Sequence, residues 1–478
     1  MTTTTTTTLD ESNPNSNLTS AAAVSTLLQL IEDYHAFNPG GVEVVPYPTA
    51  VEFSQQVSRG RPCVYRLQSL QTQQETGLNL TQQETNLNLN LKQQAEAILA
   101  CPAFSWTKEE LCEKVKGDVE VAVTPDGRAD SLYPYRHRKS SEDEDDDNTD
   151  QEAEDEHGQG HEEVFVQPAT ISMPLSSLLE KICPPQQPPA PPSSSTPSPG
   201  EPKPYSQPLS SEEEPYSHPL PSEEQEPVYY LQSQNSNLTT TALSALLADV
   251  PPQIPFATPV LGEPDAVNIW MGNALSVTST HRDPYENLYL VLRGRKHFTL
   301  WAPCEELCLH AKKVRTAHHV YDCSSSPPSF KIVLDTPSSP SPLSEVGPDS
   351  DSQSTSDSQS TSASHSDSHS DSASVSDRRI PWIPIDPLHL PPPDRLASRY
   401  PYYRHSHPLT VTVSAGEILY LPAGWFHHVR QECGVWKDGR VAPCIAVNYW
   451  FDMDYEGEKY VMREMLGRLV AVARGDKH

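Results

Sequence analysis

The stretch TSTHRDPYENLYLVLRGRKHF, residues 278–298, combines candidate metal ligands with an alternating apolar pattern. His281 and Asp283 are two residues apart, and in an extended segment such residues point to the same side. One imidazole and one carboxylate can therefore reach a single ion. The run NLYLVLRGRKHFTL that overlaps and extends the stretch reads as a strand because its apolar and polar residues alternate. The stretch predicts a β-sheet that carries half of a metal site.

A second segment, GEILYLPAGWFHHV at residues 416–429, offers the remaining ligand. It reads as an apolar strand, a turn with Pro and Gly, and then the pair His427 and His428. Two histidines and one carboxylate, with other coordination positions open, suit the non-haem Fe(II) of oxygenases. The bare spacing proves little, because the Ser-rich residues 365–367 and 369–371 repeat it where we expect no scaffold to hold a metal.

Lys296 is a candidate for binding a negatively charged cosubstrate. A dicarboxylate needs a cation at its far end, and the attraction is strongest inside a barrel from which water is excluded. Taken alone, the lysine would read as a surface residue beside Arg293 and Arg295. Thr278 offers a hydroxyl, which we expect at the end of the preceding strand.

The composition predicts one folded domain interrupted by disordered segments. Only 36% of the 478 residues are hydrophobic and 48 are Pro, so much of the chain cannot offset the entropy lost on folding. The expected disordered segments are a leader and three inserts that are acidic, Pro-rich and Ser/Asp-rich: residues 1–20, 138–163, 184–227 and 338–377. The acidic insert carries a large share of the net charge of −30 and reads as a solvated segment. The ordered parts are then residues 21–137, 164–183, 228–337, 378–452 and a C-terminal helix within 453–478.

The ordered parts predict a mainly β protein, a β-sandwich of jelly-roll type with flanking helices. Their strands are short, rich in β-branched and aromatic residues, and separated by turns. Helices are expected over residues 21–37, after Thr107, and near the C-terminus. The last of these places six apolar residues on one face: Val461, Met462, Met465, Leu466, Leu469 and Val470.

Cysteine usage and the absence of targeting patterns predict a protein of the cytoplasm or nucleus. The nine cysteines show no pairing pattern, which is typical of reduced thiols. The N-terminus has no secretory pattern, and no run of about 18 apolar residues suggests a membrane span. A pI near 4.9 argues against nucleic acid as the primary partner.

Several aromatic residues and histidines are expected to serve the fold rather than the site. Large aromatics commonly anchor β-sandwich cores, and we assign four of them to that role: Trp382, Trp425, Tyr449 and Trp450. His297 should point away from Lys296 because neighbouring strand residues face opposite sides. The remaining histidines are assigned to the surface or show no partner pattern: His310, His318, His319, His405 and His407.

Four blocks, NIWMG, VTSTHRDPYENLYLVLRGRKHF, AGEILYLPAGWFHHV and IAVNYWFDMDYE, together resemble the JmjC 2-oxoglutarate oxygenases, and most of all their lysyl hydroxylases. The resemblance implies a double-stranded β-helix that uses Fe(II), 2-oxoglutarate and O2. It implies that the iron is held by His281, Asp283 and His427. Five further residues are implied around the cosubstrate, with the lysine paired to its 5-carboxylate: Lys296, Thr278, Tyr230, Asn287 and Asn448.

By resemblance, the substrate is a lysine side chain of a protein, with developmentally regulated GTP-binding proteins hydroxylated at carbon 3 as the family precedent. The resemblance also implies a homodimer built from terminal helices. Two alternatives remain open at this point, a JmjC histone N-methyl-lysine demethylase and a catalytically silent cupin that only binds. One segment, QECGVWKDGRVAP at residues 431–443, looks longer than in the family and was expected at the mouth of the site.

The Ser/Asp-rich insert at residues 338–377 lies between the two halves of the metal site. We expect it to loop out at an edge of the sandwich, so that its removal leaves metal binding intact.

Overall fold

The computed structural model describes residues 14–68, 82–135, 162–183, 226–232, 236–335 and 379–475. Its largest sheet has nine strands in the order β1-β2-β17-β11-β21-β9-β8-β3-β7. In chain order these are β1 (Glu43–Pro46), β2 (Cys63–Arg66), β3 (Asp118–Thr124), β7 (Ala169–Pro174), β8 (Val228–Gln232), β9 (Ala266–Gly272), β11 (Tyr285–Arg293), β17 (Glu417–Leu421) and β21 (Cys444–Asp452).

Two five-stranded sheets and a two-stranded hairpin account for the other strands of the described residues. A five-stranded sheet has the order β16-β12-β18-β10-β4, formed by β4 (Arg128–Ala129), β10 (Val277–Arg282), β12 (Arg295–Trp301), β16 (Leu409–Ser414) and β18 (Phe426–Glu432). The third sheet, which we call the outer sheet, has the order β14-β13-β6-β5 with β15 also paired to β13. Its strands are β5 (Ser131–Tyr135), β6 (Glu162–Gln167), β13 (Lys312–Asp322), β14 (Ser329–Leu334) and β15 (Arg379–Trp382).

Helices surround the sheets. The α-helices are α1 (Pro14–Phe37), α2 (Ala50–Arg59), α3 (Gln82–Leu99), α4 (Lys108–Lys114), α5 (Leu175–Ile182), α6 (Asn237–Thr240), α7 (Thr258–Leu261), α8 (Pro393–Arg399) and α9 (Glu458–Arg474). Short 3₁₀ helices are η3 (Pro102–Ser105), η4 (Ala242–Asp249), η5 (Pro303–Leu309) and η6 (Tyr403–His405). Among the described helices, none is both long and apolar enough to cross a bilayer.

The nine-stranded and five-stranded sheets pack face to face, which confirms the predicted jelly roll. Tyr289 and Val291 of β11 join Phe298 of β12 and Val429 of β18 in one buried cluster between the two sheets. Because side chains alternate along a strand, the intervening residues of β11 point the other way. Both faces of β11 are therefore buried, and its run is almost continuously apolar.

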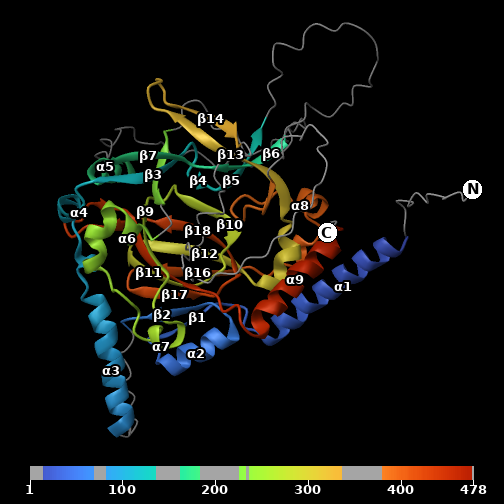
Figure 1. The fold of residues 1–478 in the computed structure, drawn as a ribbon, viewed down its shortest axis with the longest axis horizontal. Coiled ribbons are helices and arrows are strands. Elements are labelled where there is room, and N and C mark those ends of the chain that lie inside the picture. The colour runs from blue at the N-terminus through green and yellow to red at the C-terminus, as the bar shows by residue number, and fades with distance from the viewer. Residues whose placement is uncertain are drawn as a thin grey trace, which may run out of the picture.

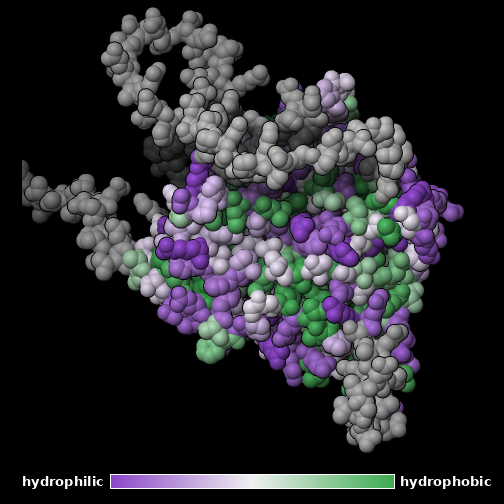
Figure 2. Space-filling view, turned by 180° about the vertical axis from the view of Figure 1, so that it is seen from behind, coloured by the Kyte–Doolittle hydropathy of each residue, from purple (hydrophilic) through white to green (hydrophobic). Residues whose placement is uncertain are grey.

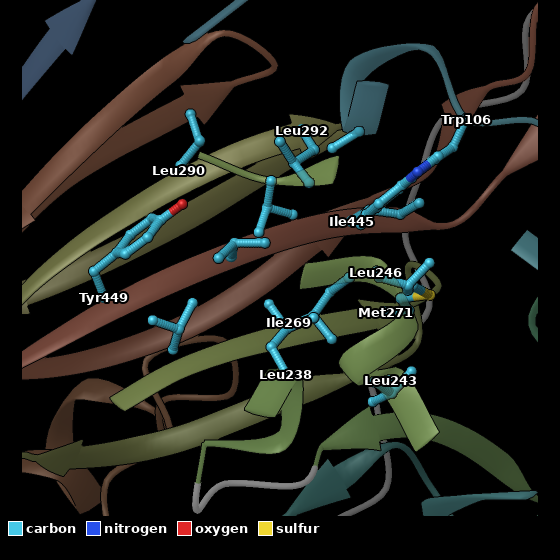
Figure 3. Packing of buried hydrophobic residues seen from close by; sticks show 14 of the residues in the cluster. Trp106, Leu238, Leu243, Leu246, Ile269, Met271, Leu290, Leu292, Ile445 and Tyr449 are labelled. Carbon is cyan, nitrogen blue, oxygen red and sulfur yellow. The ribbon is translucent and has the colours of Figure 1, made fainter. Parts of the chain in front are cut away.

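Helices cover the opposite face of the nine-stranded sheet and form the largest core. Figure 3 shows Leu290 and Leu292 of β11, Ile445 and Tyr449 of β21, and residues of η4 pointing into this layer. Trp106 closes one end, where its Nε1 donates to Asp249 at 2.6 Å. This layer buries the face of the nine-stranded sheet that points away from the five-stranded sheet with β10 and β18.

The terminal helices α1 and α9 lie side by side at one flank of the molecule (Figure 1). Leu27 and Val470 pack in a small cluster between them. The helix predicted at 21–37 ends as expected, but α1 begins at Pro14, inside the expected leader. Extending a formed helix costs less than starting one, so a sequence boundary set by the first apolar residues falls late.

The six apolar residues predicted on one face of the C-terminal helix divide between two environments. Leu466, Leu469 and Val470 pack against α1. The other three lie one to two turns earlier and are exposed: Val461, Met462 and Met465. Seen from behind, the described surface elsewhere mixes hydrophobic and hydrophilic residues, with a hydrophobic area near its middle (Figure 2).

Local signals in the sequence are confirmed at two element boundaries. The Thr107 hydroxyl accepts from the Glu110 N–H and starts α4 with a capping box. At the Pro-Asp-Gly turn, Gly127 has φ of +88° and donates its N–H to Thr124 Oγ1 at 2.9 Å. The expected acidic insert ends earlier than predicted, since β6 already starts at Glu162.

Two other expectations concern loops. Residues 431–443 form the end of β18 and a small hairpin of β19 (Gly434–Val435) and β20 (Val441–Ala442). None of them lines the large cavity, so the expected position at the site mouth is wrong. Trp436, in the hairpin loop, instead packs on Arg293, and the Cζ atom of the guanidinium lies 4.4 Å from the centroid of the Trp436 ring. The nonapeptide TQQETGLNL at residues 72–80 is nearly repeated as TQQETNLNL at residues 81–89; the second copy lies largely in α3, and the first falls outside the described residues.

Candidate metal centre

His281 and His427 face each other on neighbouring antiparallel strands. The register of β10 and β18 pairs His281 with His427, and Asp283 directly follows the last residue of β10. One ligand atom of each of the three side chains lies within 4.8 Å of the others. Asp283 Oδ1 is 3.8 Å from His281 Nε2, and its Oδ2 is 3.6 Å from His427 Nε2. The structure thus brings the three predicted ligands to one point.

Main-chain carbonyls orient the two imidazoles for metal binding. His281 Nδ1 lies 2.8 Å from the Ser279 carbonyl, and His427 Nδ1 lies 3.1 Å from the Trp425 carbonyl. A carbonyl can only accept, so each Nδ1 carries the proton and each Nε2 turns a lone pair toward Asp283. Burial lowers the pKa of His427 to about 4, which keeps this imidazole neutral. Two unprotonated nitrogens and one carboxylate, without hydrogen bonds among them, fit a divalent transition metal such as Fe(II).

A bulge and a tight turn position the strand ends. Between Thr278 and His281, β10 has one residue more than its partner β18, so both side chains reach the same cavity although they are three positions apart. Thr278 lies on a strand that precedes the one with Lys296, as expected, but near the start of that strand, β10, rather than at its end. In the turn before β18, Gly424 has φ of +81° and donates its N–H to the Asp283 carbonyl at 2.8 Å.

His428 points away from the triad. Its Nε2 lies 3.8 Å from Asp386 Oδ1, on the opposite side of β18 from His427. Burial lowers the pKa of His428 to about 4. The choice between the two histidines, open from the residues alone, follows from the alternation of one strand.

A cavity of about 830 Å³ opens over the three ligands. All five residues predicted around the cosubstrate line it, and they come from β8, β10, β11, β12 and β21: Tyr230, Thr278, Asn287, Lys296 and Asn448. One cavity therefore contains the candidate metal ligands and the candidate cosubstrate residues.

Lys296 is a buried cation without a counter-charge in the described part of the chain. Its side chain is only 2% exposed. The Nζ donates to the Tyr230 hydroxyl at 3.1 Å and lies 5.3 Å and 5.7 Å from the ring centroids of Tyr230 and Tyr289. No carboxylate of the described residues is within ion-pair distance of it. A buried, unpaired ammonium is costly, and a bound anion would relieve that cost.

The two predicted asparagines face the same cavity from adjacent strands. Asn287 is 4% exposed, and its Oδ1 has no hydrogen-bond partner among the described residues. Asn448 Oδ1 accepts from Trp270 Nε1 at 3.0 Å. An unsatisfied amide beside the triad is a group that a ligand can pair with.

Some residues of the cavity were missed or misassigned from the sequence. Tyr289 was missed, although its spacing of two from Asn287 on β11 places both on one face. Trp382 and Trp450 were assigned to the core, but both line the cavity and their Nε1 atoms have no partner among the described residues. Trp425, by contrast, is buried away from the cavity, as expected.

The other histidines differ in the groups that they contact. His297, as predicted, faces away from the cavity and lies 2.9 Å from both Thr412 Oγ1 and Glu432 Oε1. His310 was expected to lack a partner, but its Nε2 accepts from the Tyr402 N–H at 3.1 Å. His318 and His319 line the cavity, and His318 Nδ1 lies 2.9 Å from Asp335 Oδ1. The partners of His310 and His318 are distant in sequence, so spacing could not reveal them, and neither ring nitrogen of His319 has a hydrogen-bond partner among the described residues.

Comparisons with known proteins agree with this architecture. The chain is 38% identical over 243 residues, 51% of its length and 58% of the relative, to the bifunctional peptidase and (3S)-lysyl hydroxylase JMJD7 of Homo sapiens. It is 35% identical over 241 residues, 50% of its length and 57% of the relative, to JmjC domain-containing protein E of Dictyostelium discoideum. It is 34% identical over 234 residues, 48% of its length and 54% of the relative, to lysine-specific demethylase JMJ32 of Arabidopsis thaliana.

The matched segments thus span a little over half the length of each of these relatives. The model of the cupin-like domain matches residues 95–457, which include both halves of the candidate metal centre. With the jelly roll and the relatives in agreement, the chain belongs to the family of cupin-like domains and, within it, to the JmjC proteins.

Proposed function

We propose that the protein is an Fe(II)- and 2-oxoglutarate-dependent oxygenase that hydroxylates a lysine side chain of another protein. The observation that carries the proposal is the shared cavity. Three convergent ligands, His281, Asp283 and His427, stand in the same enclosed space as the unpaired ammonium of Lys296. A metal and an anionic cosubstrate are the two kinds of ligand that these groups fit.

The triad residues would hold the Fe(II). The metal and 2-oxoglutarate together supply the activation of O2 that inserts an oxygen atom into a C–H bond. The chain's own contribution is orientation, since the Ser279 and Trp425 carbonyls fix the imidazoles so that both Nε2 atoms face Asp283.

Lys296 would bind the 5-carboxylate of 2-oxoglutarate, with hydroxyl donors from Tyr230 and Thr278. Enclosure strengthens this attraction, because few water molecules can screen it. Asn287 and Asn448 lie on the adjacent strands β11 and β21, where their amides would orient the cosubstrate and the surroundings of the metal.

For the substrate we propose a lysine, oxidised at carbon 3, in a protein of the developmentally regulated GTP-binding type. The support is similarity to the human relative whose name includes (3S)-lysyl hydroxylase. The relative named lysine-specific demethylase makes N-methyl-lysine oxidation the second candidate.

The test is succinate production from 2-oxoglutarate by the purified protein with Fe(II) and ascorbate, with and without a lysine peptide from such a GTP-binding protein. We expect peptide-stimulated turnover, a gain of one oxygen atom on the lysine, and loss of both in His281→Ala. Methyl loss from an N-methyl-lysine peptide, with no gain on the unmodified one, would replace hydroxylation by demethylation. Absence of turnover in a metal-loaded protein would favour the silent binding module.

We also propose that the protein forms a homodimer through α9. Its support is the exposure of Val461, Met462 and Met465 on one helix. Sedimentation velocity should show a dimer for the wild type and a monomer for the double variant Met462→Asp, Met465→Asp. A monomeric wild type would contradict it.

A further inference from the structure

The cavity has a second wall that the proposed metal and cosubstrate do not use. Besides the triad and the residues around Lys296, the cavity is lined by β3, β8 and the outer sheet. On the outer sheet, register places Gln167 of β6 opposite His318 of β13, so these two side chains share a face. Asp335, directly after β14, has its side chain next to His318. This wall is the part of the cavity left for the substrate.

Two acceptor atoms on this wall are buried and have no donor in the described chain. Asp335 is 5% exposed at its side chain, and while its Oδ1 contacts His318 Nδ1, its Oδ2 has no partner. Gln232 donates from Nε2 to Asp130 Oδ2 at 2.9 Å, which leaves its Oε1 buried and unpaired. Buried acceptors without donors are rare because they lose water and gain nothing. A ligand with an N–H donor would satisfy the Asp335 oxygen, whereas Gln232 lies beside Asp130 and β5, at the other edge of the outer sheet from β14.

The charges on this wall select a positively charged donor. Two carboxylates line it, Asp130 next to Gln232 and Asp335 next to His318. Among the described lining residues, Arg282 already donates to Glu306 at 2.7 Å, and Lys296 donates to Tyr230. His318 carries a charge only when it is protonated.

Aromatic rings on the cavity wall suit an aliphatic stem. Phe165 and Trp382 have ring centroids 4.4 Å apart, and Trp450 stacks on Tyr285 at 4.8 Å. Phe165, Trp382 and Trp450 line the cavity. A lysine chain buries its methylene groups against apolar surface and directs its ammonium to acceptors.

We propose that Asp335 binds the ammonium group of the substrate lysine through Oδ2. The inference rests on the proposed function, since it assigns the part of the same cavity that the substrate occupies. An ammonium has three N–H donors and no acceptor, which suits a wall of unpaired acceptors. Asp335 is then a substrate-binding residue that sets specificity for an unmodified lysine over neutral analogues.

The test measures binding, so that it does not depend on turnover. Fluorescence anisotropy would follow a labelled five-residue peptide with a central lysine, bound to the full chain loaded with Mn(II) and 2-oxoglutarate. Two matched peptides replace the lysine by norleucine or by Nε-acetyl-lysine. We expect both neutral peptides to bind the wild type at least about tenfold more weakly, as loss of a charge-assisted hydrogen bond requires.

Asp335→Asn keeps the shape of the side chain and removes its charge. It should weaken lysine-peptide binding at least about tenfold and leave the norleucine peptide unchanged. Glu120→Gln is the matched control, because it removes a charge from an exposed position of the same cavity. It should change the dissociation constant less than about twofold.

Any of four results would overturn the assignment. The wild type could bind the lysine and norleucine peptides equally, or bind neither of them. Alternatively, Asp335→Asn could leave lysine-peptide binding unchanged, or Glu120→Gln could weaken it as much as Asp335→Asn does. If Asp335→Asn does not fold, Asp335→Ser is measured in its place with the same expected direction. Succinate production by the same wild-type sample separates the two claims. If the wild type binds the lysine peptide selectively but produces no succinate, only the oxygenase proposal fails. If it produces succinate but Asp335→Asn binds the lysine peptide as well as the wild type does, only the role of Asp335 fails.

Discussion

Adjacent residues of one strand have opposite environments at the candidate metal centre. His427 turns toward Asp283, and His428 turns toward Asp386 on the other side of β18. Both imidazoles are buried, so burial alone does not distinguish them. What distinguishes them is the period of two along a strand, combined with the pairing of His427 with His281.

Lys296 shows how a binding residue can reduce the stability of the unliganded fold. An ammonium that is buried without a counter-charge costs free energy, which a bound carboxylate offsets. We therefore predict that Lys296→Met raises the free energy of unfolding of the cosubstrate-free protein by about 1–3 kcal/mol. The same variant should raise the KM for 2-oxoglutarate at least about tenfold. Urea denaturation and succinate assays check the two parts, and a less stable variant with normal KM would contradict both.

His319 should make the free energy of unfolding depend on pH in the acidic range. Burial lowers its pKa from 6.5 to about 4; the nearby Asp126 raises it and His318 lowers it further. A group whose pKa is lower in the folded protein than in the unfolded chain contributes stability at pH values above its unfolded pKa. This contribution is lost as the pH falls toward its folded pKa. The free energy of unfolding should thus decrease between pH 6.5 and about 4.

His319→Phe removes this titration and keeps a ring beside Tyr133. The decrease in unfolding free energy should then be smaller than in the wild type, by up to about 3 kcal/mol. Glu305, whose pKa burial raises to about 7, acts in the opposite direction but is present in both proteins. Urea titrations at a series of pH values measure the difference, and parallel curves would contradict the prediction.

At the scale of elements, α1 is held by a polar anchor as well as by apolar packing. Glu305 of η5 is fully buried, accepts from the His407 and Ala302 N–H groups at 2.5 Å and 3.0 Å, and lies 3.1 Å from His35 Nε2. The His35 and His407 rings are 4.3 Å apart. The anchor joins α1 to the 3₁₀ helix that follows β12, a strand of the site.

The apolar contact between α1 and α9 should be measurable by paired substitutions. Leu27 is fully buried, whereas Leu30, one turn later, is 43% exposed. Leu27→Ala should lower the free energy of unfolding by about 2–5 kcal/mol. Leu30→Ala should change it by less than about 0.5 kcal/mol. Similar urea midpoints for the two variants would show that α1 is not packed as described.

At the scale of the whole molecule, two of the low-complexity segments lie between strands of the outer sheet, one between β5 and β6 and one between β14 and β15. β14 ends with Leu334 opposite Ala317, and β15 begins with Arg379 opposite Arg315. Both ends therefore meet β13 two residues apart, a spacing of about 7 Å along a strand. The strands that carry the metal ligands are not interrupted by residues 336–378.

Replacing residues 338–377 by a short Gly-Ser linker should leave the metal site unchanged, because the linker needs to close only a small gap. We expect the dissociation constant for Mn(II) to stay within about twofold of the wild type. Titration followed by electron paramagnetic resonance measures it. Loss of Mn(II) binding in a folded deletion variant would show that the segment supports the site.

The jelly roll and the triad could be predicted from the sequence because their signals are local. The apolar run of β11, the spacing of His281 and Asp283, and the Pro-Gly turn before His427 each lie within a few residues. The cosubstrate residues came from family resemblance, since Tyr230 and Lys296 meet only through the register of distant strands. Asp335 had no local signal at all, because its environment is made by the neighbouring strand β13, which carries His318.

The most direct test of the central claim is metal binding by two adjacent variants. Mn(II) titration of the full chain should give one site in the wild type and in His428→Ala. In His427→Ala, affinity should fall by more than about 100-fold, because one of three ligands is lost. Equal affinity in all three proteins, or loss in His428→Ala with retention in His427→Ala, would contradict the account.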